Sequence, residues 1–159
     1  MNHRISTLLC ALALGLAGGT AFAQTPAQTP PELQAGTIKS VRGDVQLLSA
    51  SGTQRTARPG DMLLPIDRVL TGPDSAASVV LRDGTTMVVG PSSRLDVKEF
   101  HFDATTQDGG LLVSLLRGSM RMITGLIGKK QPDAVRVETQ TATIGIRGTD
   151  FIVQADAQP

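Results

Sequence analysis

The sequence predicts an all-β protein that folds as one small domain. From Gly36 onward, short runs of aliphatic and β-branched residues are interrupted by Gly, Pro or Asp about every 8–12 residues. Long stretches of helical period are missing. The 136 residues that follow the expected leader suffice for one core and are too few for two. We expect a solenoid-like or rolled sheet of short strands, with a β-sandwich as the alternative.

The first 23 residues are typical of a cleavable export signal. Arg4 precedes an apolar stretch over residues 8–16, and Ala21, Phe22 and Ala23 form a small-x-small cleavage site. The apolar stretch is shorter than the ~20 residues that span a bilayer. Cys10 lies inside this stretch instead of after it, so we do not expect lipidation. Cleavage after Ala23 predicts a periplasmic or secreted protein.

The composition of the expected mature chain excludes several classes. Cys10 is the only cysteine, so no disulfide is available once the leader is removed. Of the 15 Lys and Arg residues only Arg4 lies in the leader, which leaves 14 basic against 14 acidic residues. This balance gives no broad field for attracting nucleic acid or an anionic membrane. No later apolar run predicts a transmembrane helix.

The chain divides into four expected segments. The leader covers residues 1–23, and a proline-rich tether, which begins QTPAQTPPELQ, covers residues 24–35. The β domain covers residues 36–154, and residues 155–159 form a tail.

A β-hairpin is predicted over residues 77–90. Asp83-Gly84 separates two β-prone runs and favours a type I′ turn. If the two strands pair regularly, alternation places Ala77, Val79 and Leu81 on one face of the first strand, and Met87 and Val89 on one face of the partner strand. Val80 and Val88 lie on the other side, which predicts that both faces of the sheet are covered.

Nine further strands are expected between glycine and proline signals. Gly43, Gly118, Gly148 and the pairs at 59–60, 72–73, 90–91 and 109–110 are interpreted as turns. The run 111–116 could form a helical turn, but the flanking glycines leave too little room for a stable helix. The strands are expected at residues 37–41, 44–48, 68–71, 94–97, 111–116, 119–123, 135–138, 141–146 and 151–154.

The search for catalytic and metal-binding groups leaves few candidates. His101 is the one histidine after the leader, so a metal site made of His and Cys is not expected, and no cofactor is indicated. Between Phe100 and Phe102 in a strand, it is predicted to point outward. A serine triad would need His101 with a serine from a set that contains no Gly-x-Ser-x-Gly motif: Ser92, Ser93, Ser114 and Ser119.

The positions of several acidic, basic and aromatic residues also indicate structural roles and not binding sites. Gly125-Leu-Ile-Gly-Lys-Lys130 resembles part of a phosphate loop, but Gln131 replaces the Ser or Thr that binds magnesium, so we interpret it as a basic loop. The three aromatic residues after the leader, Phe100, Phe102 and Phe151, are expected in the core, which leaves no stacking platform for bases or sugars. Several aspartates adjoin Gly or Pro and are expected to stabilise turns: Asp44, Asp61, Asp83, Asp108 and Asp133.

The segment TATIGIRGTDF at residues 141–151 closely resembles the terminal signature of the FecR domain family, named after the iron-dicitrate transport regulator. Shorter matches precede it: VRGDV at 41–45, PGDM at 59–62, VLTG at 69–72, LRDG at 81–84 and GPSSRL at 90–95. The resemblance implies an all-β envelope module that contacts another envelope protein. The named regulator also has a sigma-factor-binding segment and a membrane helix, whereas this chain opens with a leader, so only the periplasmic module is implied.

The signature supplies the candidate site residues, each a structural element or a partner contact: Thr143, Gly145, Arg147, Gly148, Thr149, Asp150 and Phe151. Alternation predicts that Ala142, Ile144 and Ile146 point inward, and that burial resumes at Phe151 and Val153 after a bend at Gly148. For Arg147 and Asp150 we expect a local ion pair or backbone bonding at the bend, with a partner contact as the alternative.

Three functions are compatible with the sequence. The first is a non-catalytic envelope module for protein interaction, signalling or scaffolding, recognised along an edge strand or near Arg147. The second is a module that binds cell wall or glycan. The third is an envelope hydrolase with a pair of Asp residues in a concave pocket.

Overall fold

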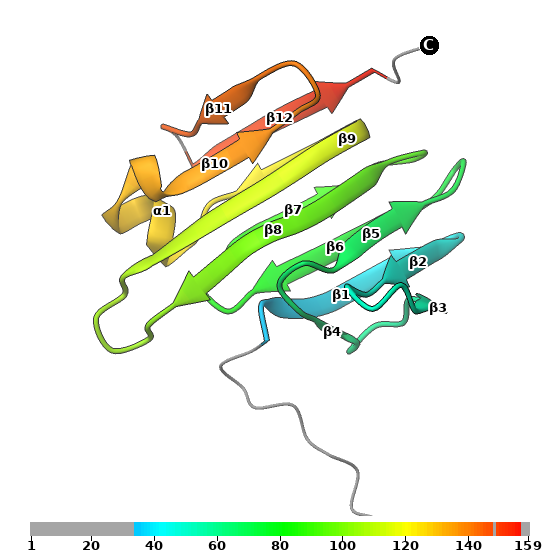
Figure 1. Ribbon diagram of the computed structural model, residues 1–159, viewed down its shortest axis with the longest axis horizontal. Helices are drawn as coiled ribbons and strands as arrows, with labels where there is room; N and C mark the ends of the chain where they lie inside the picture. Colours follow the sequence, from blue (N-terminus) through cyan, green and yellow to red (C-terminus); the bar gives the residue numbers. More distant parts are fainter. Residues whose placement is uncertain (1–33, 148, 157–159) are drawn as a thin grey trace, which may run out of the picture.

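A computed structural model describes residues 34–147 and 149–156 of the chain. These residues form the all-β fold that the sequence predicts, a single curled sheet of twelve strands (Figure 1). Of the two forms expected first, the rolled sheet is the one adopted. The expected leader, the tether up to residue 33, Gly148 and the last three tail residues lie outside the described residues. No helix in the described ranges has the length and apolar character needed to cross a membrane.

Most strands coincide with the sequence prediction, with several differences. The expected strands 111–116 and 119–123 are one continuous strand, and the expected strand 94–97 extends to Phe102. The strands are β1 (Gly36–Arg42), β2 (Val45–Leu48), β3 (Gln54–Thr56), β4 (Met62–Leu63), β5 (Arg68–Thr71), β6 (Ala76–Leu81), β7 (Thr86–Val89), β8 (Arg94–Phe102), β9 (Gly109–Ile123), β10 (Val135–Glu138), β11 (Thr143–Gly145) and β12 (Asp150–Ala155). The short strands β3 and β4 were not predicted. A helix α1 (Leu126–Lys130) and a 3-10 turn η2 (Pro132–Ala134) connect β9 to β10.

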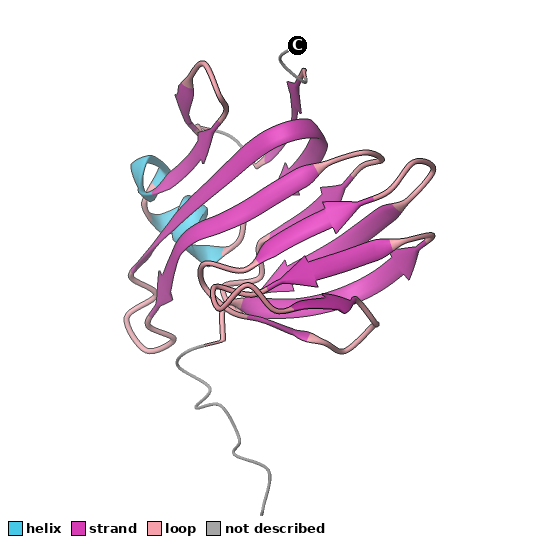
Figure 2. Ribbon diagram, turned by 45° about the vertical axis from the view of Figure 1, so that its right-hand side comes forward, coloured by secondary structure: helices cyan, strands magenta, loops and turns pink. Residues whose placement is uncertain are grey.

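The centre of the sheet consists of four long strands, each bent near its middle. In three of them the bend separates two labelled strands, β1 from β2, β5 from β6 and β7 from β8, and the fourth is β9. β1 and β2 run antiparallel to β6 and β5, which in turn run antiparallel to β7 and β8. Both β7 and β8 pair with the continuous strand β9. The bends fold the sheet into a first layer, with β4, β1, β6, β7 and the C-terminal half of β9, and a second layer, with β3, β2, β5, β8 and the N-terminal half of β9. Figures 1 and 2 show this folded sheet.

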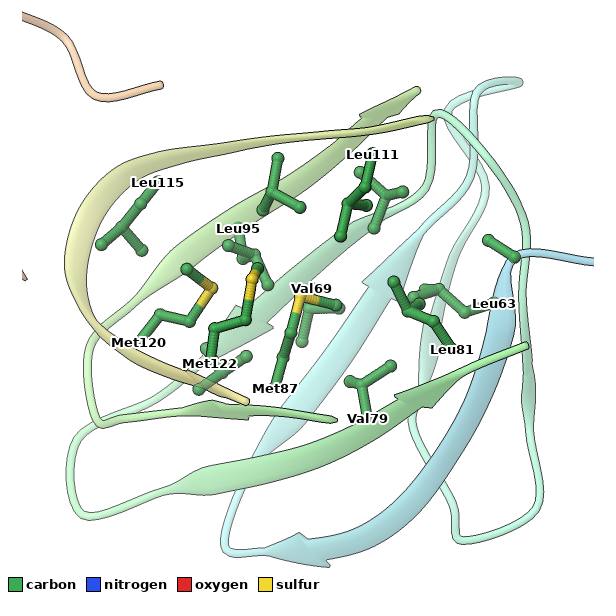
Figure 3. Packing of buried hydrophobic residues seen from close by; sticks show 14 of the residues in the cluster. Leu63, Val69, Val79, Leu81, Met87, Leu95, Leu111, Leu115, Met120 and Met122 are labelled. Atoms are coloured by element: carbon green, nitrogen blue, oxygen red, sulfur yellow. The ribbon is translucent and has the colours of Figure 1, made fainter. Parts of the chain in front are cut away.

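The core lies between the two layers. Alternate residues of most strands point inward, as the period of two requires, and Figure 3 shows aliphatic and methionine side chains of both layers in contact. In the β6–β7 hairpin, the three residues expected to share a face of β6 and the two expected to share a face of β7 all point into this core and are at most 2% exposed. The expectation that the other side is covered as well is wrong, because Val88 is 41% exposed.

A Gly-Pro-x-Ser sequence forms two of the bends. It occurs at residues 72–75, between β5 and β6, and at residues 90–93, between β7 and β8. The third residue has a positive φ in both copies, 53° at Asp74 and 49° at Ser92. The sequence predicted turns here, but the strand continues in the same direction across each copy. Gly-Pro favours any sharp change of direction, so a corner within a strand resembles a turn in sequence.

The serine that ends each Gly-Pro-x-Ser copy joins neighbouring strands at the bend. The hydroxyl of Ser75 donates to the carbonyl of Pro73 (3.0 Å) and accepts the N–H of Asp44 (2.9 Å). In the second copy the hydroxyl of Ser93 donates to the carbonyl of Pro91 and accepts the N–H of Ser119, both at 3.0 Å. The bends of adjacent strands are therefore bonded to one another, and the layers meet along one line of corners.

The β6–β7 hairpin is confirmed, but its turn differs from the expected type I′. Asp83 keeps a negative φ, and only Gly84 of the Asp-Gly pair is positive, at 83°. The N–H of Gly84 donates to the carbonyl of Leu81 (3.0 Å), and the N–H of Leu81 donates to the carbonyl of Thr85 (2.8 Å). This is a three-residue loop, a type I turn followed by a left-handed glycine. The carboxylate of Asp83 accepts bonds from Thr85, which stabilises this loop.

The segment expected to be a basic loop, residues 125–130, instead contains α1. Strand β10 runs parallel to β9, and a parallel pair requires a crossover connection, which α1 and η2 provide. The N–H of Leu126 donates to the carbonyl of Asp83 (2.8 Å), and the N–H of Gly125 donates to the hydroxyl of Thr85 (2.9 Å). A side chain at Gly125 would collide with the β6–β7 turn. At five residues, α1 is too short to leave a helical period in the sequence.

At the margin of the sheet formed by β3 and β4, side-chain and backbone bonds join the two layers. The guanidinium of Arg55 on β3 contacts the carboxylate of Asp61 (2.5 Å) and donates to the carbonyl of Met62 on β4 (2.9 Å). The N–H of Ala57 donates to Val45 of the second layer, and the N–H of Gly60 donates to Ile38 of the first layer. The segment between β3 and β4 therefore covers this margin.

Candidate functional site

The terminal signature lies at the opposite margin of the sheet, beyond β9 (Figure 1). β10 extends the second layer and pairs with β11, whereas β12 runs antiparallel to the C-terminal half of β9 in the first layer. The signature begins before β11 and ends in β12, so its residues are distributed over both layers. The structure therefore divides the candidate residues into two groups.

Strand β11 carries Thr143 and Gly145 and forms an exposed edge. All three of its residues are exposed, and their register pairs Gly145 with Arg136 and Ile144 with Val137 of β10. Among the described strands, β11 pairs with β10 only, so its outer edge has no strand partner. A Cβ added at Gly145 would meet no described atom within 4 Å. An unpaired edge of this kind can accept an additional strand.

The expected inward alternation of the signature is wrong for Ala142 and Ile144. Both are exposed, Ile144 to 38%, and Ile146 alone of the three is buried. Neither face of β11 is covered by the opposite layer, so alternation there does not lead to burial. Further on, Val153 is buried as expected, while Phe151 is half-buried and packs against the core.

The expected local ion pair between Arg147 and Asp150 is also wrong, because each side chain has another partner. Arg147 lies 3.5 Å from the carboxylate of Asp133 in η2, and these two side chains are 82% and 81% exposed. An ion pair this long and this exposed adds little stability. The guanidinium of Arg147 is thus held only loosely beside β11.

Asp150 forms a two-pronged ion pair with Arg121 of β9. The Nε and Nη2 atoms of Arg121 donate to the two carboxylate oxygens at 2.9 and 2.6 Å. These hydrogen bonds lower the pKa of Asp150 and raise the pKa of Arg121. The carbonyl of Thr149 accepts the N–H of Thr124 (3.0 Å), next to this pair. Thr149 and Asp150 therefore attach the start of β12 to β9.

The structure places His101 as predicted, but of the five turn aspartates only Asp61 and Asp83 have carboxylates that accept a nearby backbone N–H among the described residues. His101 is exposed on β8, between buried Phe100 and half-buried Phe102. Asp61 accepts the backbone N–H of Arg58 (2.8 Å). Asp108 binds the ammonium of Lys130 (2.7 Å), and this hydrogen bond lowers the pKa of Asp108. Within residues 34–147 and 149–156, no group of three His, Asp or Glu side chains is arranged to hold a metal ion.

One buried carboxylate, that of Asp67, was not considered from the sequence. Burial raises its pKa, while the N–H of Leu64, at 2.9 Å, and the positive charge of Arg55 act in the opposite direction. A raised carboxyl pKa is also found in general acids. Here the N–H of Asp67 also donates to the carbonyl of Leu64, so two hydrogen bonds join these residues and Asp67 forms part of a turn.

Sequence reasoning also missed Arg94 and Arg117. They lie directly opposite each other on β8 and β9, and both are exposed. A cavity of about 350 Å³ opens beside them. Their proximity depends on the register of two strands and on a bulge after Arg94, which no local pattern shows.

Comparisons with known proteins identify the family. No curated protein matches the chain. One solved structure with some similarity, described as a cell surface anchoring domain, is 30% identical over 40% of this chain and 83% of its own, with a TM-score of 0.38. The family model described as FecR protein matches residues 67–159, which is more than half of the chain and includes both Gly-Pro-x-Ser copies, β9 and the terminal signature. The chain therefore belongs to the FecR family.

Proposed function

We propose that this protein is a non-catalytic, exported module of the cell envelope that binds another envelope protein along strand β11. Membership of the FecR family is consistent with a role in the envelope. The observation that carries the proposal is the outer edge of β11, which no described strand pairs and whose residues Thr143–Gly145 are all exposed. A partner strand would add main-chain hydrogen bonds there, and side chains on β11 would select its sequence.

The candidate residues have different roles in this proposal. Thr143 and Gly145 present the edge, and Arg147 supplies a positive charge next to it, since its ion pair with Asp133 is long and exposed. Asp150 and Phe151 are structural, because one is paired with Arg121 and the other packs against the core. Thr149 joins them through its backbone bond to Thr124. Gly148 lies outside the described residues, and its role stays a prediction.

The experiment is affinity capture from an envelope extract with matched variants. Ile144→Lys and Arg147→Ala alter the β11 edge, while Arg58→Ala removes an exposed arginine near the opposite margin. We expect the wild-type protein and Arg58→Ala to recover the same partner, and the two edge variants to recover less of it. Recovery of an identical set of proteins by all four would remove β11 as the contact.

A further inference from the structure

We propose that the cavity beside Arg94 and Arg117 is a binding site for a phosphate group. It lies in the second layer, next to the corner between β7 and β8, and goes beyond the proposed contact along β11. Its volume is about 350 Å³. Its walls include the two arginines, the aliphatic side chains of Leu70 and Leu116, and Gln140.

The two guanidinium groups lack a carboxylate partner among the described residues. Arg94 and Arg117 are Cα partners across β8 and β9, and like charges in directly opposite positions destabilise a sheet. The nearby carboxylate of Asp96 is bound by Arg68 through two hydrogen bonds of 2.5 and 2.6 Å. Asp156 borders a neighbouring hollow together with Arg117, but these two residues form no ion pair. The repulsion is therefore not relieved by any described residue.

The donors of these arginines are available to a ligand. Arg94 makes no hydrogen bond with any described residue, and Arg117 uses only its Nε, which donates to the carbonyl of Ser92 (2.9 Å). That bond fixes the plane of the Arg117 guanidinium and leaves both terminal nitrogens unengaged among the described groups. A planar guanidinium binds the oxygens of a phosphate or a carboxylate through paired hydrogen bonds.

Two arginines that line the same cavity favour a phosphate over a carboxylate. A phosphate monoester carries about 1.5–2 negative charges at neutral pH and three strong acceptor oxygens, so one group can bind both guanidiniums and cancel their repulsion. A carboxylate has one charge and is satisfied by one arginine. Leu70 and Leu116 offer aliphatic surface to the organic part of a phosphate ester. The phosphate could belong to a soluble ester or to a lipid headgroup.

Calorimetric titration at low ionic strength, where charges are least screened, tests the site. The probes are inorganic phosphate, glucose 6-phosphate and phosphatidylcholine vesicles that contain phosphatidic acid. The variants are Arg94→Gln and Arg117→Gln, and Arg136→Gln is the matched control, because it removes the same charge from an exposed position on β10. We expect the site variants to bind about tenfold more weakly or worse, since each loses charge-assisted hydrogen bonds, and the control to bind like the wild type.

The probes distinguish the source of the phosphate. Saturable binding of glucose 6-phosphate indicates a soluble ester, saturable binding of inorganic phosphate alone indicates the free ion, and binding of vesicles alone indicates a lipid headgroup. Each of these results supports the site if binding of that probe is lost in both Arg94→Gln and Arg117→Gln. Equal weakening in all three variants would show a general charge effect and overturn the proposal, as would the absence of saturable binding to every probe. The β11 contact does not depend on any of these results.

Discussion

Gly118 shows how much a single residue matters at the corners. It has a φ of 90°, and an added Cβ would collide with Ser93, whose hydroxyl binds the backbone of β9. Gly52 has a similar φ of 83° with open space around it. We expect Gly52→Ala to lower the free energy of unfolding by about 1 kcal/mol, and Gly118→Ala to lower it by about 1–3 kcal/mol more, because the corner is overpacked. Urea denaturation measures both, and equal losses would contradict the assigned role of the corner.

At the scale of elements, the crossover between β9 and β10 depends on one hydroxyl. Thr85 is fully buried, donates to Asp83 (2.7 Å) and accepts the N–H of Gly125 at the start of α1. Thr85→Val keeps the shape but removes the bond to one carboxylate oxygen of Asp83 and leaves the N–H of Gly125 without its acceptor, so we expect a loss of about 1–3 kcal/mol in unfolding free energy and faster amide exchange in α1. Thr86→Val, on the half-buried side of β7, is the control. Unchanged exchange in α1 would show that the turn does not hold the crossover.

For the whole molecule, the central prediction is export followed by cleavage. Expression with the native leader should yield a periplasmic protein that begins at Gln24, because residues 21–23 form the small-x-small site. The intact mass of the periplasmic fraction measures this. Ala21→Leu and Ala23→Leu should leave the uncleaved form, since bulky side chains do not fit such a site. A wild-type protein recovered uncleaved from the cytoplasm would exclude both the leader and the proposed place of action.

Strand positions that depend on the local sequence pattern were predicted correctly. Contacts that depend on the register between strands were missed. The runs at 68–71 and 135–138 became strands with the expected bounds, because β-branched runs between breakers have few alternatives. Burial of Ile144 was mispredicted because it requires a covering layer, which alternation cannot show. The pair of Arg121 with Asp150 joins residues 29 positions apart, and the Arg94–Arg117 pair arises from the pairing of β8 with β9. The candidate site was therefore predicted as one sequence segment. The sequence did not show that part of it forms the exposed edge of β11 and part of it attaches β12 to β9.

The sheet has one covered margin and one open margin, and this asymmetry limits how the protein can assemble. Arg55 and the segment after it cover the margin beside β3 and β4, whereas β11 and β12 are the last described strands on the other side, each with an outer edge that no described strand pairs. We expect two copies that join through both of these edges to expose only their covered margins. Growth by strand addition would then stop at a closed pair, so this architecture disfavours the fibre formation that threatens proteins with two open margins.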